Sequence, residues 1–466
     1  MRWISYVLKF FLLIWVVVFI SACNEDDEPV TDEQYVNNWI YDNMTFWYYW
    51  YQKIPSNPNR NQATREFFQS LRVAEDRFSS LHEDYQQVLN ALDGVTREAG
   101  YEYTLYRESQ GSTNVVAQVL YIKPASPAAA TALKRGDLIT QINGQAITID
   151  NYRTLTAQTA NTHTITYRTL SNETSTSGTF GEPVTITLEA VVLEENPNYL
   201  TTTFELDGGR KAGYFVYHFF TAGVGNGTEY NQQMDQIMAD LKAQGITDLI
   251  VDLRYNSGGY TSAAINLASL IGKGIDASKI FYRQEYNQKV VDYFKITDAN
   301  KNVLFANKAQ NVGSSLSGNL YILTGSTTAS ASELVINGLR PFMPVFLIGE
   351  VTLGKNVGSI PVYKEDDPRN RWLMLPIVTK SFNSSGQSDY DNGFVPDLLV
   401  EEGIYLMPLG DPNEPLLSAA LARLSSSSGR LSIPETANPF GERLDTSTAM
   451  RERAVRQLIL DDVPDQ

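Results

Sequence analysis

Residues 248–259 read Asp-Leu-Ile-Val-Asp-Leu-Arg-Tyr-Asn-Ser-Gly-Gly, an apolar run of strand length that ends in a polar loop with two adjacent glycines. Continuously apolar strands are typical of parallel sheets that are covered on both faces. Adjacent glycines let the backbone approach a ligand closely and point N–H groups at an anion, although a plain tight turn gives the same pattern. The stretch therefore predicts the centre of an α/β sheet, with a loop suited to chemistry at the carboxyl end of a strand.

The sequence on both sides of this stretch alternates between strand and helix patterns. Short apolar runs predict strands at residues 214–217, 320–323 and 345–348. Helices are expected around 234–241, around 263–270 and from about residue 330. This alternation predicts a layered, largely parallel sheet covered by helices.

Two further strand ends carry unusual loops. Residues 325–333 are mostly small and lead into an apolar helix, so Ser330 by itself is well explained as a helix N-cap. Residues 349–356 have the glycine and lysine spacing of a phosphate-binding loop, but Asn356 stands where that motif needs Ser or Thr to hold Mg²⁺. We therefore expect no nucleotide.

Histidines and cysteines are too few for several common catalytic sites. The chain has three histidines, His82, His163 and His218, and only His218 falls in the α/β region. A Ser-His-Asp triad is hard to build from this set, and no group of His, Cys and carboxylates has metal-ligand spacing. What remains is Ser-Lys catalysis, in which a neutral lysine amine takes the serine proton, with no metal and no cofactor.

A small β-rich module is expected between about residues 99 and 192. Residues 126–144, with a short helix, a Gly-Asp turn, an apolar strand and an Asn-Gly turn, resemble part of a PDZ domain. Such domains bind extended peptide tails by strand addition beside a loop of backbone N–H groups. The candidate loop is Gly100, Tyr101, Glu102 and Tyr103. A docking or gating module with an occluded groove is the alternative.

The segments 252–259, 329–333 and 354–355 occur in the order found in the tail-specific, C-terminal processing serine peptidases, and together they resemble that family's signature. A later segment, 392–397, is also similar, and the resemblance spans about residues 33–424. It implies a crotonase-like α/β catalytic domain preceded by a PDZ domain.

The resemblance assigns roles to individual residues. It implies that Ser330, three residues before Glu333, is the nucleophile, and that Lys355 is the base. Backbone N–H groups of Gly258 and Ala331 would hold the oxyanion. Glu333 would support the site, although a carboxylate at a helix start is also favoured by the helix dipole.

Lys355 can act as a base near neutral pH only if its pKa falls by about three units from the usual value of about 10.4. Apolar neighbours are expected to supply the desolvation: Phe346, Leu347, Ile348, Val351 and Leu353.

The chain departs from the family at two positions. Pro341 stands where some members have Asp, and Ser359 stands where Gln is common. These departures concern accessory contacts and leave the Ser-Lys pair intact.

The N-terminus is typical of a bacterial lipoprotein. Residues 10–20 are apolar, too short to span a membrane, and are followed by Ser-Ala-Cys. Cys23 is the only cysteine of the chain, so a lipid anchor at this residue accounts for it. We expect a signal peptide over residues 1–23 and a chain anchored in the bacterial cell envelope, at the outer membrane.

The remaining composition limits the partners. With a formal charge of −16, the chain lacks the basic surface that nucleic-acid binding requires.

The expected organisation is α/β multidomain, and its parts follow in chain order: 1–23 signal peptide, 24–98 acidic tether and helical N-terminal region, 99–192 PDZ-like domain, 193–424 peptidase domain, 425–466 peripheral tail.

The sequence therefore predicts a serine endopeptidase that cleaves unfolded or C-terminal-tail-presenting polypeptides in the cell envelope. One alternative is a non-catalytic envelope receptor that binds protein tails through its PDZ-like domain, and another is a glucan- or lipid-binding lipoprotein.

Overall fold

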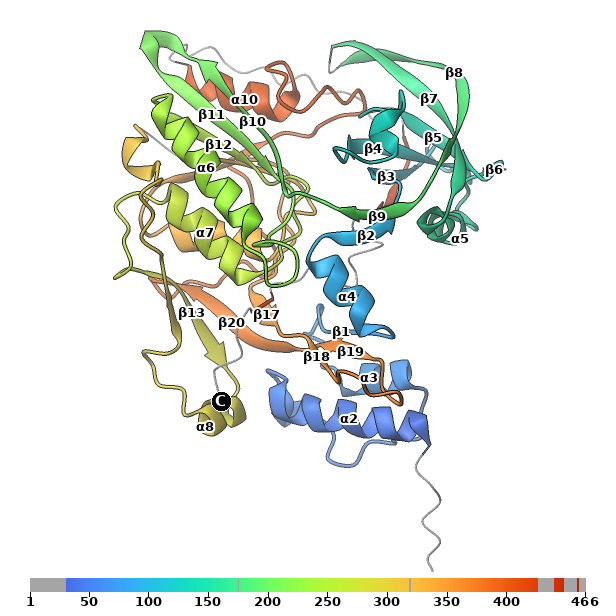
Figure 1. Ribbon diagram of the computed structural model, residues 1–466, viewed down its shortest axis with the longest axis vertical. Coiled ribbons are helices and arrows are strands. Elements are labelled where there is room, and N and C mark those ends of the chain that lie inside the picture. The colour runs from blue at the N-terminus through green and yellow to red at the C-terminus, as the bar shows by residue number, and fades with distance from the viewer. Residues whose placement is uncertain (1–30, 175, 318–319, 426–439, 448–458, 461–466) are drawn as a thin grey trace, which may run out of the picture.

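A computed structural model describes residues 31–174, 176–317, 320–425, 440–447 and 459–460. The signal peptide and Cys23, on which the lipid-anchor prediction rests, lie outside this part of the chain. The described chain has the predicted α/β multidomain organisation, with a helix-covered sheet, a smaller β-rich domain and a helical N-terminal region (Figure 1). Within the described residues, no helix is both long and apolar enough to cross a membrane.

The main sheet has the strand order β10-β11-β12-β15-β16-β21. Its strands are β10 (Asn198–Glu205), β11 (Lys211–Tyr217), β12 (Asp248–Asp252), β15 (Leu320–Thr324), β16 (Val345–Gly349) and β21 (Leu398–Leu399). All neighbouring pairs from β11 to β21 are parallel, and β10 joins β11 antiparallel. The predicted parallel sheet is therefore present, with the loop at residues 253–259 at the carboxyl end of a central strand.

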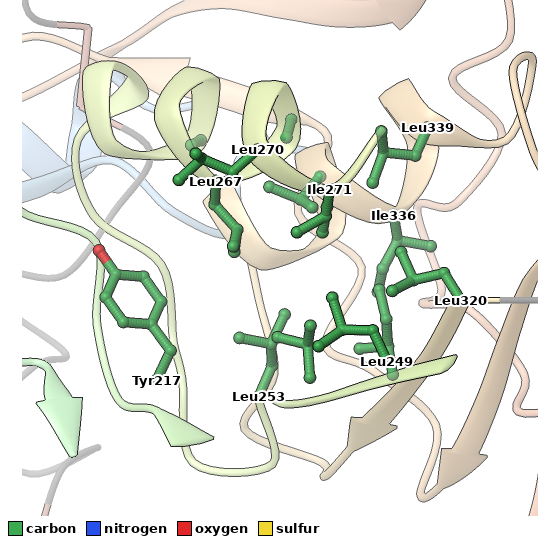
Figure 2. Packing of buried hydrophobic residues seen from close by; sticks show 14 of the residues in the cluster. Tyr217, Leu249, Leu253, Leu267, Leu270, Ile271, Leu320, Ile336 and Leu339 are labelled. Carbon is green, nitrogen blue, oxygen red and sulfur yellow. The ribbon is translucent and has the colours of Figure 1, made fainter. Parts of the chain in front are cut away.

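Both faces of this sheet are covered, which explains the continuously apolar strands. Helices α6 (Glu229–Ala243), α7 (Thr261–Ile271) and α9 (Ala331–Leu339) pack on one face, and α10 (Pro415–Leu424) packs on the other. Along β12, Leu249 and Val251 belong to the first core, whereas Ile250 belongs to the second. Figure 2 shows residues of α7 and α9 meeting Leu249 and Leu253 in the first core.

The small β-rich domain forms a separate sheet with the order β22-β3-β4-β5-β7-β8, and β6 pairs with β5. Its elements are β3 (Tyr101–Arg107), β4 (Val115–Ile122), β5 (Leu138–Ile142), β6 (Gln145–Ala146), α5 (Tyr152–Ala157), β7 (His163–Thr174), β8 (Ser177–Leu188) and β22 (Arg443–Thr446). Strand β22 comes from the end of the chain and pairs antiparallel with β3. The expectation of a peripheral tail is wrong for these residues, because their backbone completes a sheet.

The N-terminal region is helical only in part. Helices α2 (Asp32–Trp47), α3 (Thr64–Leu71) and α4 (Tyr85–Leu92) are present, but Leu81 lies in strand β1 (Ser80–His82). Strand β1 pairs with β19 (Leu373–Leu375), and Leu81 is the partner of Met374. The prediction of a helical region over residues 24–98 is therefore wrong at this point, because Asp76 Oδ1 accepts the N–H groups of Phe78 and Ser79 in a turn that leads into β1.

A third sheet lies below the main sheet in Figure 1 and has the order β14-β13-β20-β17. Its strands are β13 (Ile280–Tyr286), β14 (Asn302–Leu304), β17 (Val357–Ser359) and β20 (Ile377–Asn383), and α8 (Gln288–Phe294) follows β13. Strand β17 begins two residues after Lys355. The loop that carries this lysine therefore runs between the main sheet and the third sheet.

Candidate active site

Ser330 occupies a strained position at the start of α9. It is the N-cap residue, with φ of 62° and ψ of −113°, in a region that residues other than glycine rarely adopt. Its Oγ is buried and has no hydrogen-bond partner in the described part of the chain. By contrast, Ser332 Oγ donates to the carbonyl oxygen of Asn256 at 3.0 Å. Strain of this kind is concentrated at functional sites, so the geometry favours Ser330 over Ser332 as the reactive hydroxyl.

Glu333 joins the Ser330 helix to the Lys355 loop. Its Oε2 accepts the backbone N–H of Ser330 at 2.8 Å and that of Lys355 at 2.7 Å. Its Oε1 accepts the Gly354 N–H at 2.7 Å and the Thr352 hydroxyl at 2.6 Å. Burial raises the pKa of Glu333, and these four hydrogen bonds oppose that rise. One carboxylate oxygen thus holds the backbones of Ser330 and Lys355 beside each other.

Lys355 is buried, with 3% of the residue exposed. Burial lowers the pKa of its amine to about 7, and the carboxylates of Asp76 and Glu333 limit the fall. The Nζ atom lies 5.2 Å from the ring centroid of Phe78. Near neutral pH, a large share of the amine is therefore unprotonated and able to accept a proton.

The source of this burial differs from the sequence-based expectation. Val351 and Leu353 were expected to desolvate Lys355, but they are 39% and 41% exposed, since they lie in the loop beyond the end of β16. The cover includes Phe78, which comes from the N-terminal region. The Arg77 guanidinium ties this segment to the Lys355 loop and to the loop at residue 391 by donating to the carbonyl oxygens of Leu353 and Asp391.

Asp76 is a second site residue that the sequence alone did not single out. It is buried, and its Oδ2 accepts the hydroxyl of Tyr48 at 2.8 Å. Its Oδ1 accepts the N–H groups of Phe78 and Ser79, so the carboxylate fixes the turn that brings Phe78 to Lys355. The only sequence signal was the Asp-x-Phe-Ser turn pattern, which indicates a local turn but no distant partner.

The glycine loop lies directly against Ser330. A Cβ atom on Gly258 would lie 2.7 Å from Ser330 Cβ and 3.1 Å from the Ala331 backbone nitrogen, and Gly258 has φ of 113°. Only glycine fits this approach. The structure thus brings Gly258, Ala331 and Ser330 together, and the Ala331 N–H belongs to the first turn of α9, where no intrahelical partner exists.

The Gly258 N–H itself is occupied. It donates to Asn256 Oδ1 at 2.9 Å, and Asn256 Nδ2 donates to the Tyr217 carbonyl oxygen. The carbonyl oxygen of Asn256 accepts the Ala329 N–H and the Ser332 hydroxyl. Asn256 is therefore a positioning residue that links the glycine loop to the Ser330 segment, and an oxyanion would have to share or replace its bond to Gly258.

Arg254, to which the sequence assigned no role, is structural. Its guanidinium is buried and makes ion pairs with Asp252, Glu402 and Glu414. Burial alone would raise the pKa of Glu402, but Arg135 of the small β-rich domain and Arg254 lower it to about 2. This cluster of charges joins the two domains.

The candidate peptide-binding residues Gly100, Tyr101, Glu102 and Tyr103 lie at the beginning of β3, with Gly100 directly before the strand. The Tyr103 N–H donates to Ser447 Oγ at 2.8 Å, and Glu102 pairs with Lys123 at 3.0 Å.

His218, the histidine of the α/β region, is buried against Tyr121 and Tyr199. No group of His, Cys, Asp and Glu in the described residues could hold a metal ion.

A helix-covered parallel sheet with a buried Ser-Lys-Glu cluster at its strand ends describes a peptidase, and comparison with known proteins gives its family. Residues 211–400 match the domain described as Peptidase family S41, and residues 35–80 match the Peptidase S41 N-terminal domain. The chain therefore belongs to the S41 peptidases, in agreement with the resemblance seen in its motifs.

Individual relatives agree with this assignment. A carboxyl-terminal-processing protease from Picosynechococcus sp. is 27% identical over 368 residues, which cover 74% of this chain and 78% of the relative. The carboxy-terminal processing protease CtpA of Bacillus subtilis is 28% identical over 170 residues, covering 36% of this chain and 32% of the relative. The crystal structure of a putative S41 protease from Bacteroides fragilis superposes with a TM-score of 0.68 at 29% identity, covering 83% of this chain and 96% of that chain.

Proposed function

We propose that this S41 peptidase is a serine endopeptidase in which Ser330 is the nucleophile and Lys355 is the general base. The observation that carries the proposal is the buried Lys355, whose amine has a pKa of about 7 and whose backbone N–H shares Glu333 Oε2 with the backbone N–H of Ser330. A neutral lysine amine and an unpartnered serine hydroxyl, on two segments whose backbones are held beside each other, are the groups that Ser-Lys catalysis needs.

The reaction follows in two halves. Lys355 accepts the proton of Ser330 Oγ as Oγ attacks the carbonyl carbon of the peptide bond, and the Ala331 N–H stabilises the oxyanion. The Lys355 ammonium then gives that proton to the leaving amine as the C–N bond breaks, which leaves an acyl ester on Ser330. Water, deprotonated by Lys355, hydrolyses the ester and restores the hydroxyl.

The rate should depend on pH through Lys355. Because only the neutral amine is a base, kcat/KM is expected to rise about tenfold per pH unit below about pH 7 and to level off above it. The measurement uses a peptide substrate without titrating groups. Lys355→Arg, which stays protonated, should be inactive over the whole range. A rate that is flat down to about pH 5 would exclude Lys355 as the base.

The buried amine should also cost stability. Its pKa is about 7 in the folded chain and 10.5 in the unfolded reference, so between these values the unfolded chain binds more protons and stability rises with pH. Lys355→Met is expected to raise the free energy of unfolding near neutral pH by about 0.5–2 kcal/mol. It should also reduce the increase of the free energy of unfolding with pH. Urea unfolding near pH 7 and near pH 9 measures both effects. A less stable methionine variant would contradict this explanation.

We further propose that the substrates are unfolded or C-terminal-tail-presenting polypeptides and that the enzyme is lipid-anchored at Cys23 in the bacterial cell envelope. The names of the relatives support processing of carboxyl termini. The PDZ-like interpretation of residues 99–192, and the crotonase-like interpretation of the peptidase domain, belong to the same proposal. The apolar segment before Cys23 supports the anchor.

The test uses the chain without residues 1–23 and an unfolded protein with an apolar C-terminal tail, compared with the same protein ending in charged residues. Mass spectrometry of the products locates the cleaved bonds. We expect cleavage that is faster for the apolar tail and absent in the Ser330→Ala variant. If the wild-type chain cuts neither substrate over a broad pH range, or if the Ser330→Ala chain cuts equally well, the proposal fails. Metabolic labelling of cells with a radioactive lipid precursor tests the anchor. The wild-type protein should become labelled, and the Cys23→Ala variant should not.

A further inference from the structure

Two described parts of the C-terminal tail, residues 440–447 and 459–460, lie on backbone edges that accept an added strand. The first edge belongs to β3 of the small β-rich domain. The second lies between the glycine loop, at residues 259–261, and Ser359 of β17. The tail thus contacts both the candidate peptide-binding strand and the segments that adjoin the candidate catalytic residues in sequence.

At the first edge, β22 covers β3 as an antiparallel strand. Thr446 is the register partner of Thr104, and the Arg107 N–H donates to the Glu442 carbonyl oxygen at 2.9 Å. Ser447 Oγ then accepts the Tyr103 N–H at 2.8 Å. The tail therefore runs toward the beginning of β3, the direction that an added peptide takes when its carboxyl end approaches the loop at Gly100.

At the second edge, Ile459 and Leu460 complete a backbone ladder. The Ile459 N–H donates to the Gly259 carbonyl oxygen at 3.1 Å, and its carbonyl oxygen accepts the Thr261 N–H at 3.0 Å. On the other side, the Leu460 N–H donates to the Ser359 carbonyl oxygen at 3.1 Å. Gly259 directly follows Gly258, which contacts Ser330, and Ser359 lies four residues after Lys355.

Both tail side chains fill apolar sockets. Ile459 is fully buried among Val88, Leu92, Leu373 and Leu375, which come from α4 and β19. Leu460 is buried in another cluster, with Ile360 and Val378 and with the partly buried Trp47 and Val362. These two sockets therefore accept an extended segment with two consecutive branched aliphatic side chains.

The same contacts would serve an incoming polypeptide. The bonds that Ile459 and Leu460 make to the Gly259 carbonyl oxygen, the Thr261 N–H and the Ser359 carbonyl oxygen are backbone bonds, which any extended backbone can make in their place. Recognition by backbone bonds and aliphatic sockets is tolerant of sequence. Occupation by the tail and occupation by another extended segment are therefore mutually exclusive.

We propose that the C-terminal tail is an intramolecular competitor, which occupies the polypeptide-binding path and must leave before another extended, aliphatic polypeptide can bind. Its effect on catalysis rests on the proposed function, whereas the competition itself does not. A tethered segment has an effective concentration on the order of 1 mM, so a tail with an intrinsic Kd of about 0.1 mM weakens binding of a competitor about tenfold.

The experiment measures binding without turnover. Four Ser330→Ala proteins lacking residues 1–23 are compared: the otherwise unchanged chain, a chain ending at Ser425, Ile459→Ser, and the control Val192→Ser, a substitution at an exposed position on β9 (Val191–Glu194). The probe is a fluorescent synthetic peptide of residues 440–466, followed by anisotropy. We expect the shortened chain to bind about tenfold more tightly than the unchanged chain, Ile459→Ser to bind more tightly as well, and Val192→Ser to match the unchanged chain.

Equal affinity of the shortened and unchanged chains, or no binding by a folded shortened chain, overturns the proposal. If the shortened chain melts below the assay temperature, Ile459→Ser decides, and failure of this variant to bind more tightly than Val192→Ser overturns the proposal. With Ser330 intact, removal of the tail should raise kcat/KM about tenfold. Loss of all cleavage together with retained competition would reject the proposed function alone.

Discussion

Replacing Ser330 by alanine is expected to lower kcat for peptide cleavage by about 10⁴–10⁶-fold, because no other described group is placed to form the acyl ester. Ser332→Ala is the matched control, since its hydroxyl donates to the Asn256 carbonyl oxygen and is not available to attack. We expect Ser332→Ala to retain most activity and to lose about 1 kcal/mol of stability. Initial rates with a fluorogenic peptide, together with thermal unfolding of each variant, provide the comparison.

The Ser330 prediction extends to its partner. Lys355→Ala should lose activity to a similar degree, because the effects of residues that act as a unit do not add. The double variant Ser330→Ala/Lys355→Ala should therefore be no slower than either single variant. If Ser332→Ala is the inactive protein and Ser330→Ala is active, the assignment of the nucleophile is wrong.

The second large effect is expected at Glu333. Glu333→Gln keeps the shape of the side chain but turns an NH₂ group toward one or two backbone N–H donors, so at least one of the four hydrogen bonds is lost and replaced by a contact between two donors. We expect the free energy of unfolding to fall by about 2–4 kcal/mol and kcat to fall about 10²-fold or more. Urea unfolding and initial rates measure the two effects.

A pH profile separates positioning from mere stability at Glu333. The carboxylate raises the pKa of Lys355, so Glu333→Gln should move the midpoint of the pH–rate profile to lower pH. Glu414→Gln is the matched control, because Glu414 is also buried and accepts the Leu417 N–H at the start of α10. That variant should lose stability without moving the midpoint. An unmoved midpoint in Glu333→Gln would show that this carboxylate is only structural.

Local pattern was sufficient for the parts of the fold and site that depend on neighbouring residues. The strands at 248–252 and 320–324 were predicted because their apolar runs reflect burial on both faces of a parallel sheet. The loops after these strands were singled out because reactive groups collect at the carboxyl ends of strands in an open α/β sheet, and these ends share one edge. The structure places Ser330, Gly258 and Glu333 at that edge.

The remainder depends on long-range contacts that leave no periodic trace. Phe78 and Asp76 act on Lys355 across more than 270 positions of the chain, and only folding brings them together. Val351 and Leu353 are apolar but exposed, because hydrophobicity alone does not say which loop residues face solvent. The tail was misjudged for the same reason, since Ile459 is apolar within a polar segment whose partners lie far away.

Because β22 pairs with β3, the sheet of the small β-rich domain cannot form completely until β22 has been synthesised. Tyr103 and Ser447, which bond across this edge, are separated by 344 positions. At a ribosomal rate of about 5–20 residues per second, the small domain waits roughly 20–70 seconds for its last strand. During that interval, β3 is an open edge that other chains can join. A nascent copy, or one that ends before β22, would therefore tend to associate through this strand, whereas a copy that contains β22 covers the edge itself.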